Sequence, residues 1–237
     1  SVPSAAKRHG VDTVAVTDHD RLHPGLDEPL TKIDGVQVVH GIELRVEAAC
    51  GRVDLLGYGV SPTAELRELV ESLQTDRVER GRKIVERVER ETGVELDISI
   101  EEGIGRPHIA RAIENSSAPY DYEAAFAELI GGDCPCYVSR DIPSFETGRD
   151  CLGAACGVVG LAHPFRYPEP ERALELVERL DAVEWDYPYD HAIDEDLLAR
   201  TVDEHDAVVT GGSDAHDTAL GVAGLDTDEW AAFRQHL

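Results

Sequence analysis

The 237-residue sequence lacks the features that direct a protein to a membrane or an oxidising compartment. Its longest apolar runs, such as residues 157–162, are far shorter than the ~20 residues that a membrane span needs. No charged and then apolar leader precedes Ser1, so we expect no secretion. The five cysteines form no CxxC pair, which argues against a disulfide framework and against a structural zinc site. These absences favour a globular cytoplasmic protein.

Basic residues are also scarce. Lys and Arg number 22 against 48 Asp and Glu, which gives a net charge of −26, and only three of the cations are lysines. Such a field repels a phosphate backbone and excludes stable binding of duplex nucleic acid, but a small anionic substrate remains compatible if metal ions reverse the local sign. The charge balance favours a halophilic protein in a salt-rich cytoplasm over an ordinary acidic cytosolic enzyme.

Short apolar runs alternate with helical stretches along the chain, which is typical of α/β architecture. The predicted strands are 11–17, 36–44, 53–60, 157–162, 182–185 and 207–211. The predicted helices are 4–9, 63–92, 109–114, 122–130, 171–180 and 194–204. Gly81 is expected to bend or break the long helix. Because residues 62–145 contain no convincing strand, we predict an α/β barrel formed by 1–61 and 146–237, with a helical insertion at 62–145.

Ionisable residues cluster at the C-terminal ends of four predicted strands. They are Asp18, His19 and Asp20, then Glu43, then His163, and finally Asp214 and His216. In parallel barrels the active site forms at this rim, and imidazoles mixed with carboxylates suit divalent ions. Asp18 and Asp20 are interpreted as groups that orient imidazoles or as turn residues. Asp54 lies near the beginning of its strand, so it is either a ligand or a solvent-facing carboxylate.

These residues resemble the PHP (polymerase and histidinol phosphatase) family, whose pattern includes T-D-H, G-x-E, A-H-P and S-D-x-H. Members are distorted (β/α)7 barrels that bind two or three metal ions, so the resemblance implies that fold here, with the first strand apparently absent. The ligands it implies are His19, Glu43, Asp54, His163, Asp214 and His216.

The segment Arg106-Pro107-His108-Ile109-Ala110-Arg111 resembles the subgroup of 3′,5′-nucleoside bisphosphate phosphatases and related 5′-exonucleases. Arg106 and His108 precede a predicted helix, where a guanidinium and a helix N-terminus suit a phosphate, so we predict that they bind substrate. The alternative for Arg106 is a structural arginine in an acid-rich protein.

Three departures from the family pattern stand out. The opening H-x-H and the aspartate after it are absent. Asp54 stands where the subgroup has a histidine, which shifts the expected preference to Mn²⁺ or Mg²⁺ over Zn²⁺, with Fe²⁺ a further alternative. The strand after A-H-P, which often bears a histidine near a proline, is followed here by Pro188 and His191.

The sequence therefore predicts a metal-dependent phosphoesterase in which a metal-activated water attacks the phosphate of a small phosphorylated nucleotide. The substrate that the resemblance implies is a nucleoside 3′,5′-bisphosphate or the 5′ end of a short oligonucleotide. His216 or His191 is expected to protonate the leaving oxygen. The alternatives are a small-metabolite phosphatase of the histidinol phosphate type and a catalytically degenerate PHP binding module.

Overall fold

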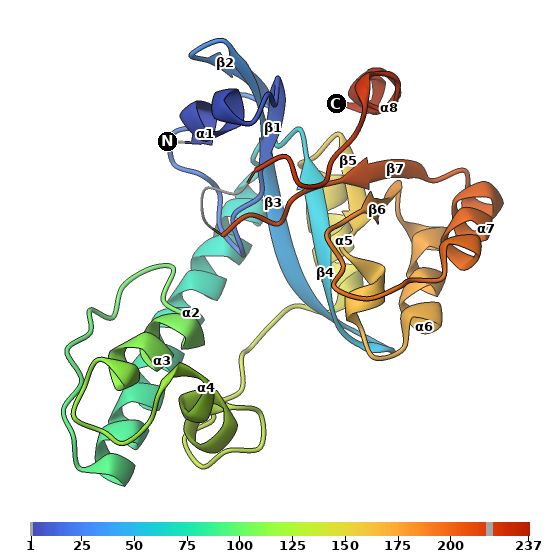
Figure 1. Ribbon diagram of the computed structural model, residues 1–237. Coiled ribbons are helices and arrows are strands. Elements are labelled where there is room, and N and C mark those ends of the chain that lie inside the picture. Colours follow the sequence, from blue (N-terminus) through green and yellow to red (C-terminus); the bar gives the residue numbers. More distant parts are fainter. Residues whose placement is uncertain (1, 217–219) are drawn as a thin grey trace. The chain divides into compact units, whose positions relative to one another are not determined.

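The computed structural model describes residues 2–216 and 220–237, which fall into two compact units (Figure 1). The first unit contains the chain up to Arg67 together with Pro143–Leu237, and the second contains Glu68–Ile142. The prediction had placed the insertion at 62–145. No helix in the described residues is long and apolar enough to cross a membrane.

The first unit is built on a seven-stranded sheet in which β1, β3, β4, β5, β6 and β7 follow one another and β2 pairs with β3. The strands are β1 Thr13–Val16, β2 Leu30–Ile33, β3 Val36–Ala48, β4 Gly51–Tyr58, β5 Val158–Leu161, β6 Ala182–Asp186 and β7 Val208–Gly211. The helices of this unit are α1 Val2–Arg8, α5 Phe145–Gly153, α6 Pro170–Leu174, α7 Glu195–His205 and α8 Thr227–Phe233. All six predicted strands are present, whereas β2 was not predicted.

The predicted barrel is not confirmed, because the sheet is open. Strands β1 and β7 stand at the two ends of the strand order, and no pairing joins them among the described residues. The middle strands also differ from a parallel barrel, since β3, β4 and β5 are antiparallel neighbours. A short turn at residues 49–50 connects β3 directly to β4, so no crossover helix separates these two strands as it would in a βα unit.

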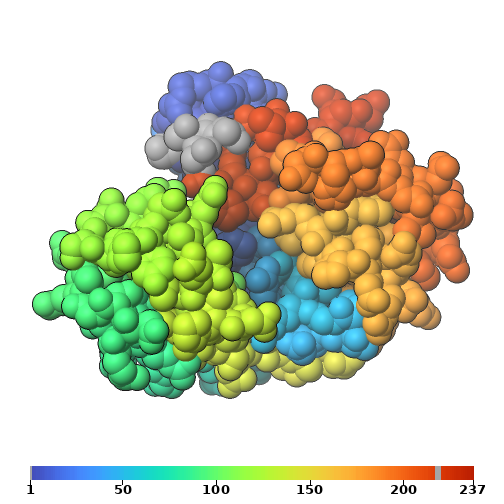
Figure 2. Space-filling model, turned by 60° about the horizontal axis from the view of Figure 1, so that its bottom comes forward, coloured from blue at the N-terminus to red at the C-terminus, as the bar shows by residue number. Residues whose placement is uncertain are grey.

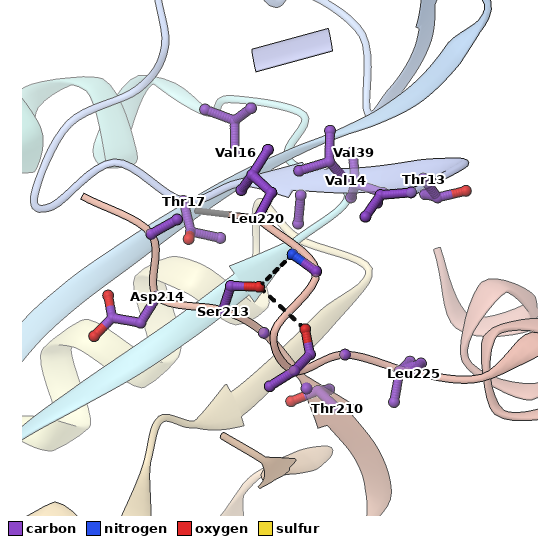
Figure 3. A pocket seen from close by; sticks show the side chains of 18 of the residues that line it. Thr13, Val14, Val16, Thr17, Val39, Thr210, Ser213, Asp214, Leu220 and Leu225 are labelled. Atoms are coloured by element: carbon purple, nitrogen blue, oxygen red, sulfur yellow. Dashed lines mark hydrogen bonds between the residues drawn. The ribbon is translucent and has the colours of Figure 1, made fainter. Parts of the chain in front are cut away.

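A groove of about 1350 Å³ runs along the open edge of β1 (Figure 3). Thr13, Val14 and Val16 line it from β1, and Thr210 lines it from β7. The loop after β7 is held by Ser213, whose Oγ accepts the Gly221 N–H at 2.9 Å and donates to the Ala223 carbonyl at 3.2 Å. The groove is also lined by candidate ligands at the strand ends, so it gives access to them.

The tip of the β3–β4 hairpin lies beside the chain that follows β5. The light-blue surface of the hairpin adjoins the amber surface of that segment in Figure 2, and the Arg172 guanidinium donates to the Ala49 carbonyl at 3.1 Å. This contact ties α6 to the hairpin that carries two of the candidate ligands.

The second unit is helical and has a core of its own. Its helices are α2 Ala64–Thr92, which begins in the first unit, α3 Arg106–Glu114, and α4 Tyr122–Ala124 with the π-helical turns Ala125–Ile130. Ile84, Val88, Ile109, Ile113 and Leu129 belong to one buried cluster. A bend or a break was expected at Gly81, and of these the break is wrong, because helix α2 is continuous. A Cβ at Gly81 would approach Ile104 at 3.1 Å, which explains a glycine inside a helix as an adaptation to close packing.

One buried histidine of the sheet has no hydrogen-bond partner for either ring nitrogen in the described part of the chain. His40 lies in β3 and is 0% exposed. Burial, followed by the charge of the nearby His23, lowers the pKa of His40 below its ordinary value of 6.5. His40 is therefore neutral in the folded protein at pH 7 and resists protonation there.

Burial of His40 predicts that the free energy of unfolding decreases at acidic pH. Below about pH 6.5 the unfolded chain protonates His40 before the folded chain does, so the free energy of unfolding falls as the pH drops from there toward the lowered pKa of the folded chain. The His40→Leu variant removes the buried imidazole and is expected to lose less stability than the wild type between pH 7 and pH 5. Urea unfolding at several pH values measures both slopes, and parallel slopes would contradict this role for His40.

Candidate metal centre

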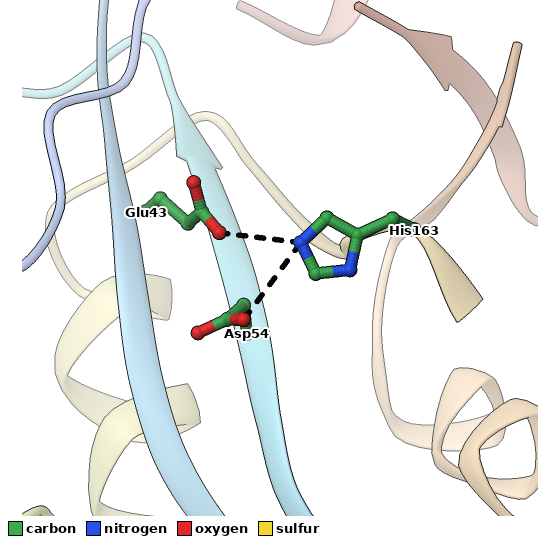
Figure 4. A group of neighbouring side chains, drawn as sticks. All are labelled: Glu43, Asp54 and His163. Carbon is green, nitrogen blue, oxygen red and sulfur yellow. Dashed lines mark hydrogen bonds and ion pairs between the residues drawn. The ribbon is translucent and has the colours of Figure 1, made fainter. Parts of the chain in front are cut away.

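Three buried side chains from neighbouring parts of the sheet converge in the first unit (Figure 4). Glu43 lies in β3, Asp54 in β4, and His163 directly after β5, and they are 6%, 1% and 5% exposed. The His163 Nε2 atom lies 3.3 Å from Glu43 Oε1 and 3.7 Å from Asp54 Oδ2. One ligand atom from each of the three lies within 4.8 Å of the others, so a single ion could contact all three residues.

Strand register explains why these side chains share one face. Arg45 is directly opposite Asp54 in the antiparallel β3–β4 pair, so both point to the same face of the sheet. Glu43 is two residues before Arg45 and therefore points the same way. The Ala162 N–H donates to the Asp54 carbonyl at 3.0 Å, which places the next residue, His163, beside Asp54.

A second group of side chains continues from Glu43 toward the chain after β7. The His19 Nδ1 atom lies 3.3 Å from Glu43 Oε2, and its Nε2 atom lies 3.3 Å from His216 Nε2. His216 Nδ1 in turn lies 2.9 Å from the Asp214 carbonyl. Backbone hydrogen bonds fix the His19 loop against β3, since the Asp20 N–H donates to the Glu43 carbonyl at 2.8 Å. The two oxygens of Glu43 thus face two different histidines.

Charge in the buried cluster is only partly balanced by the protein. The Arg45 guanidinium donates to both carboxylate oxygens of Asp54, but no described residue is such a partner for Glu43. Burial alone would lower the pKa of His163, but the charges of Glu43, Asp54 and Glu184 outweigh it, and the pKa is raised. A cation among these groups would therefore replace the proton that His163 otherwise takes up.

Glu184 on β6 contacts the backbone of His163, one of the three clustered residues. Its Oε2 accepts the backbone N–H of His163 at 2.8 Å, and burial raises the pKa of Glu184 to about 8. This carboxyl group therefore takes up a proton more readily than an exposed glutamate does. Its main effect is to fix the backbone of His163, which adopts a positive φ of 29°.

The donor set fits a divalent cation. Carboxylate oxygens and imidazole nitrogens together are the ligands that Mn²⁺, Fe²⁺ and Zn²⁺ accept, and a carboxylate that faces two groups of donors can bridge two ions. The residues that would hold an ion are Glu43, Asp54 and His163. His19 lies at the other oxygen of Glu43, and His216 lies beside His19, so these two histidines are candidates for holding a further ion.

The structure thus brings Glu43, Asp54 and His163 together, with His19 and His216 next to Glu43, whereas the Asp214 carboxylate contacts Arg166 and Tyr187. Metal ligation by the six predicted residues stays a prediction. The solvent-facing interpretation of Asp54 is wrong, since this side chain is buried. Of the two aspartates interpreted as orienting or turn residues, Asp20 is 1% exposed and accepts the Arg45 N–H at 3.0 Å, whereas Asp18 contacts Arg21.

His191 lies in a smaller pocket of about 390 Å³ that Asp214 and His216 also line. Its side chain is 51% exposed, and its Nδ1 atom lies 2.8 Å from Asp190 Oδ1. The hydrogen bond from His191 lowers the pKa of Asp190. This contact engages Nδ1, so the Nε2 atom of His191 is available to a ligand.

Arg106 and His108 lie in the second unit, at the start of α3. An Arg106 Nη atom donates to the Ile130 carbonyl at 3.3 Å, and the guanidinium stacks near the rings of Phe126 and Tyr137. His108 Nδ1 accepts the Gly105 N–H at 3.1 Å and so caps the helix. Both side chains have structural contacts, and their predicted role in substrate binding stays a prediction.

Sequence reasoning missed several residues around the centre. Arg45 could have been found from its position two residues after Glu43 on the same strand, and Glu184 from its place in a predicted strand. Arg166 and Tyr187 carry no signal in the sequence, yet both contact Asp214 Oδ2, at 3.2 and 2.8 Å. Tyr167 accepts the Asp54 N–H at 2.8 Å.

Comparison with known proteins agrees with this chemistry, although no protein-family model matches the chain. It is 28% identical over 232 residues to a 3′,5′-nucleoside bisphosphate phosphatase from Chromobacterium violaceum, with 90% of this chain and 79% of that protein covered. A 5′-3′ exoribonuclease from Haemophilus influenzae is 24% identical over 169 residues, or 68% of this chain and 61% of that protein. The chain is related to phosphoric ester hydrolases. The resemblance to 3′,5′-nucleoside bisphosphate phosphatases and 5′-exonucleases that its motifs suggest is thereby confirmed.

Two solved structures share the fold of this chain. A protein from Bifidobacterium adolescentis described as a metal-dependent phosphoesterase aligns with a TM-score of 0.76 at 23% identity, over 99% of this chain and 89% of that one. An amidohydrolase from Chromobacterium violaceum, solved with sulfate and without metal, gives 0.76 at 22% identity, over 100% and 90% of the two chains.

The geometry predicts that Glu43 is needed for metal binding. The Glu43→Gln variant keeps the size of the side chain but removes its charge, and we expect its affinity for Mn²⁺ to fall by more than about ten-fold. Isothermal titration calorimetry of the purified protein measures this. Glu47→Gln is the matched control, because Glu47 lies on the same strand with its side chain 54% exposed. Equal losses in the two variants would contradict a specific site.

Proposed function

We propose that this protein hydrolyses a phosphate monoester or diester with divalent metal ions at the centre around Glu43. The observation that carries the proposal is the buried convergence of Glu43, Asp54 and His163, with His19 on the second oxygen of Glu43. Divalent ions bound there would supply Lewis-acid stabilisation of the phosphoryl group and lower the pKa of the attacking water. Relationship to a phosphatase and an exoribonuclease supports the same class of reaction.

The substrate we propose is a nucleoside 3′,5′-bisphosphate or the 5′ end of a short oligonucleotide. The 28% identity to a bisphosphate phosphatase supports this choice, and the net charge of −26 argues against duplex nucleic acid as a partner. Arg106 and His108 are proposed to contact a substrate phosphate. For the ions, the two carboxylates at Glu43 and Asp54 favour Mn²⁺ or Mg²⁺, since oxygen donors suit these harder cations.

The protein's own groups have distinct tasks in this proposal. Arg166 and Tyr187 hold the Asp214 carboxylate in place, and Arg45 holds that of Asp54. The Nε2 atom of His216 faces His19, and this position suits a metal ligand. His191 is therefore the better proton donor to the leaving oxygen, because its Nε2 atom faces away from the bond to Asp190 and an imidazole transfers protons near neutral pH.

Low lysine content and an excess of acidic residues lead us to propose that the protein works in the cytoplasm of a salt-rich cell. Activity is therefore best measured in molar KCl, where screening reduces the repulsion among its carboxylates.

The direct test is release of phosphate from adenosine 3′,5′-bisphosphate with Mn²⁺ in molar KCl. We expect turnover by the wild type and a loss of at least about 100-fold in kcat/KM for His163→Ala, since this variant removes a ligand at the reacting group. His236→Ala, at an exposed histidine, is the control and should match the wild type. Metal binding without turnover would favour a different phosphoester, such as histidinol phosphate, and neither metal binding nor turnover would favour a binding module.

A further inference from the structure

A pocket beside the metal centre has aromatic walls that the hydrolytic chemistry does not require. Its volume is about 390 Å³, and its lining includes Arg166, Tyr187, Tyr189 and His191. Asp214 and His216 belong both to this pocket and to the candidate metal centre. A molecule bound in the pocket would thus reach the centre directly.

The aromatic rings in this pocket come from one short segment. Aromatic residues make up only 5% of the chain, yet Tyr187, Tyr189 and His191 follow each other at alternate positions. Their ring centroids are 4.8 Å apart for the first pair and 5.7 Å apart for the second, and the planes are tilted by 52° and 60°. Phe165 packs its edge against Tyr189 at 5.8 Å and 88°. The segment therefore presents a continuous aromatic surface.

Hydrogen bonds within the protein occupy the tyrosine hydroxyls. The Tyr187 hydroxyl donates to Asp214 Oδ2 at 2.8 Å and accepts from Arg166 at 2.9 Å. Burial, followed by the hydrogen bond to Asp214, raises the pKa of Tyr187 to about 12. The Tyr189 hydroxyl accepts the Phe165 N–H at 3.4 Å. These hydrogen bonds hold the two tyrosine rings in place. The faces of the rings are therefore the surfaces that a ligand can contact.

We propose that the aromatic surface of Tyr187 and Tyr189 binds the nucleobase of the substrate by stacking. A planar heterocycle matches the faces of tyrosine rings that hydrogen bonds hold in place, whereas a bare sugar phosphate would leave these faces exposed to water. The volume lies within the range of small-molecule sites. Stacking reads no base edge, so the site should accept every base, with purines bound more tightly than pyrimidines because of their larger faces.

This inference rests on the proposed phosphoesterase function, and its test separates the two. The Tyr189→Leu variant keeps an apolar side chain but removes the ring, and Tyr189→Phe keeps the ring but removes the hydroxyl. We compare kcat/KM for adenosine 3′,5′-bisphosphate with that for ribose 5-phosphate, which has no base. Calorimetric binding of adenosine 5′-monophosphate to the Mn²⁺-loaded protein gives a readout that does not depend on turnover.

Tyr189→Leu is expected to reduce the preference for the nucleotide over the sugar phosphate by about ten-fold, mainly through KM, and to weaken binding of the nucleotide to a similar extent. Tyr189→Phe should retain both. An equal loss on the two substrates, or an unchanged preference in Tyr189→Leu, would overturn the base site while leaving the hydrolase intact. Absence of turnover in the wild type, together with nucleotide binding that Tyr189→Leu weakens, would overturn the proposed hydrolysis and support the base site.

Discussion

The candidate centre depends on one buried carboxylate that faces two histidines. Glu43 is 6% exposed, and its two oxygens lie 3.3 Å from His163 and 3.3 Å from His19. Arg45 neutralises the neighbouring Asp54, but no comparable partner is present at Glu43 among the described residues. A carboxylate buried at this depth without an arginine or lysine partner is costly unless a proton on a neighbouring histidine or a metal ion balances its charge, and two histidines beside it suit a metal site.

Strand β3 makes this arrangement possible. Over its thirteen residues it pairs with β1 and β2 near its beginning and with β4 over the rest of its length. It therefore connects the loop that carries His19 to the hairpin that carries Asp54. The antiparallel β4–β5 pair then brings His163 to the same place. Side chains distant in sequence meet because a single long strand is shared by several neighbours.

Much of the fold and most of the centre could be predicted from the sequence, because continuous apolar runs mark buried strands and polar motifs follow them. Strand β2 was not predicted because it is only four residues long and includes the exposed Lys32. Openness of the sheet could not be predicted, since it depends on whether β1 and β7 pair. The sequence alone leaves two interpretations of Asp54, a ligand or a solvent-facing carboxylate, because this residue lies near the beginning of the predicted strand 53–60. In the antiparallel β3–β4 pair, however, Asp54 is opposite Arg45, which is two residues from Glu43 on the same face of β3.

Anomalous diffraction from crystals soaked in MnCl₂ would locate the ions without reference to any substrate. The structure predicts peaks in contact with Glu43, one on the side of Asp54 and His163 and a further one on the side of His19 and His216. Peaks confined to exposed carboxylates such as Glu47, with none at Glu43, would contradict the assignment of this buried cluster as a metal centre.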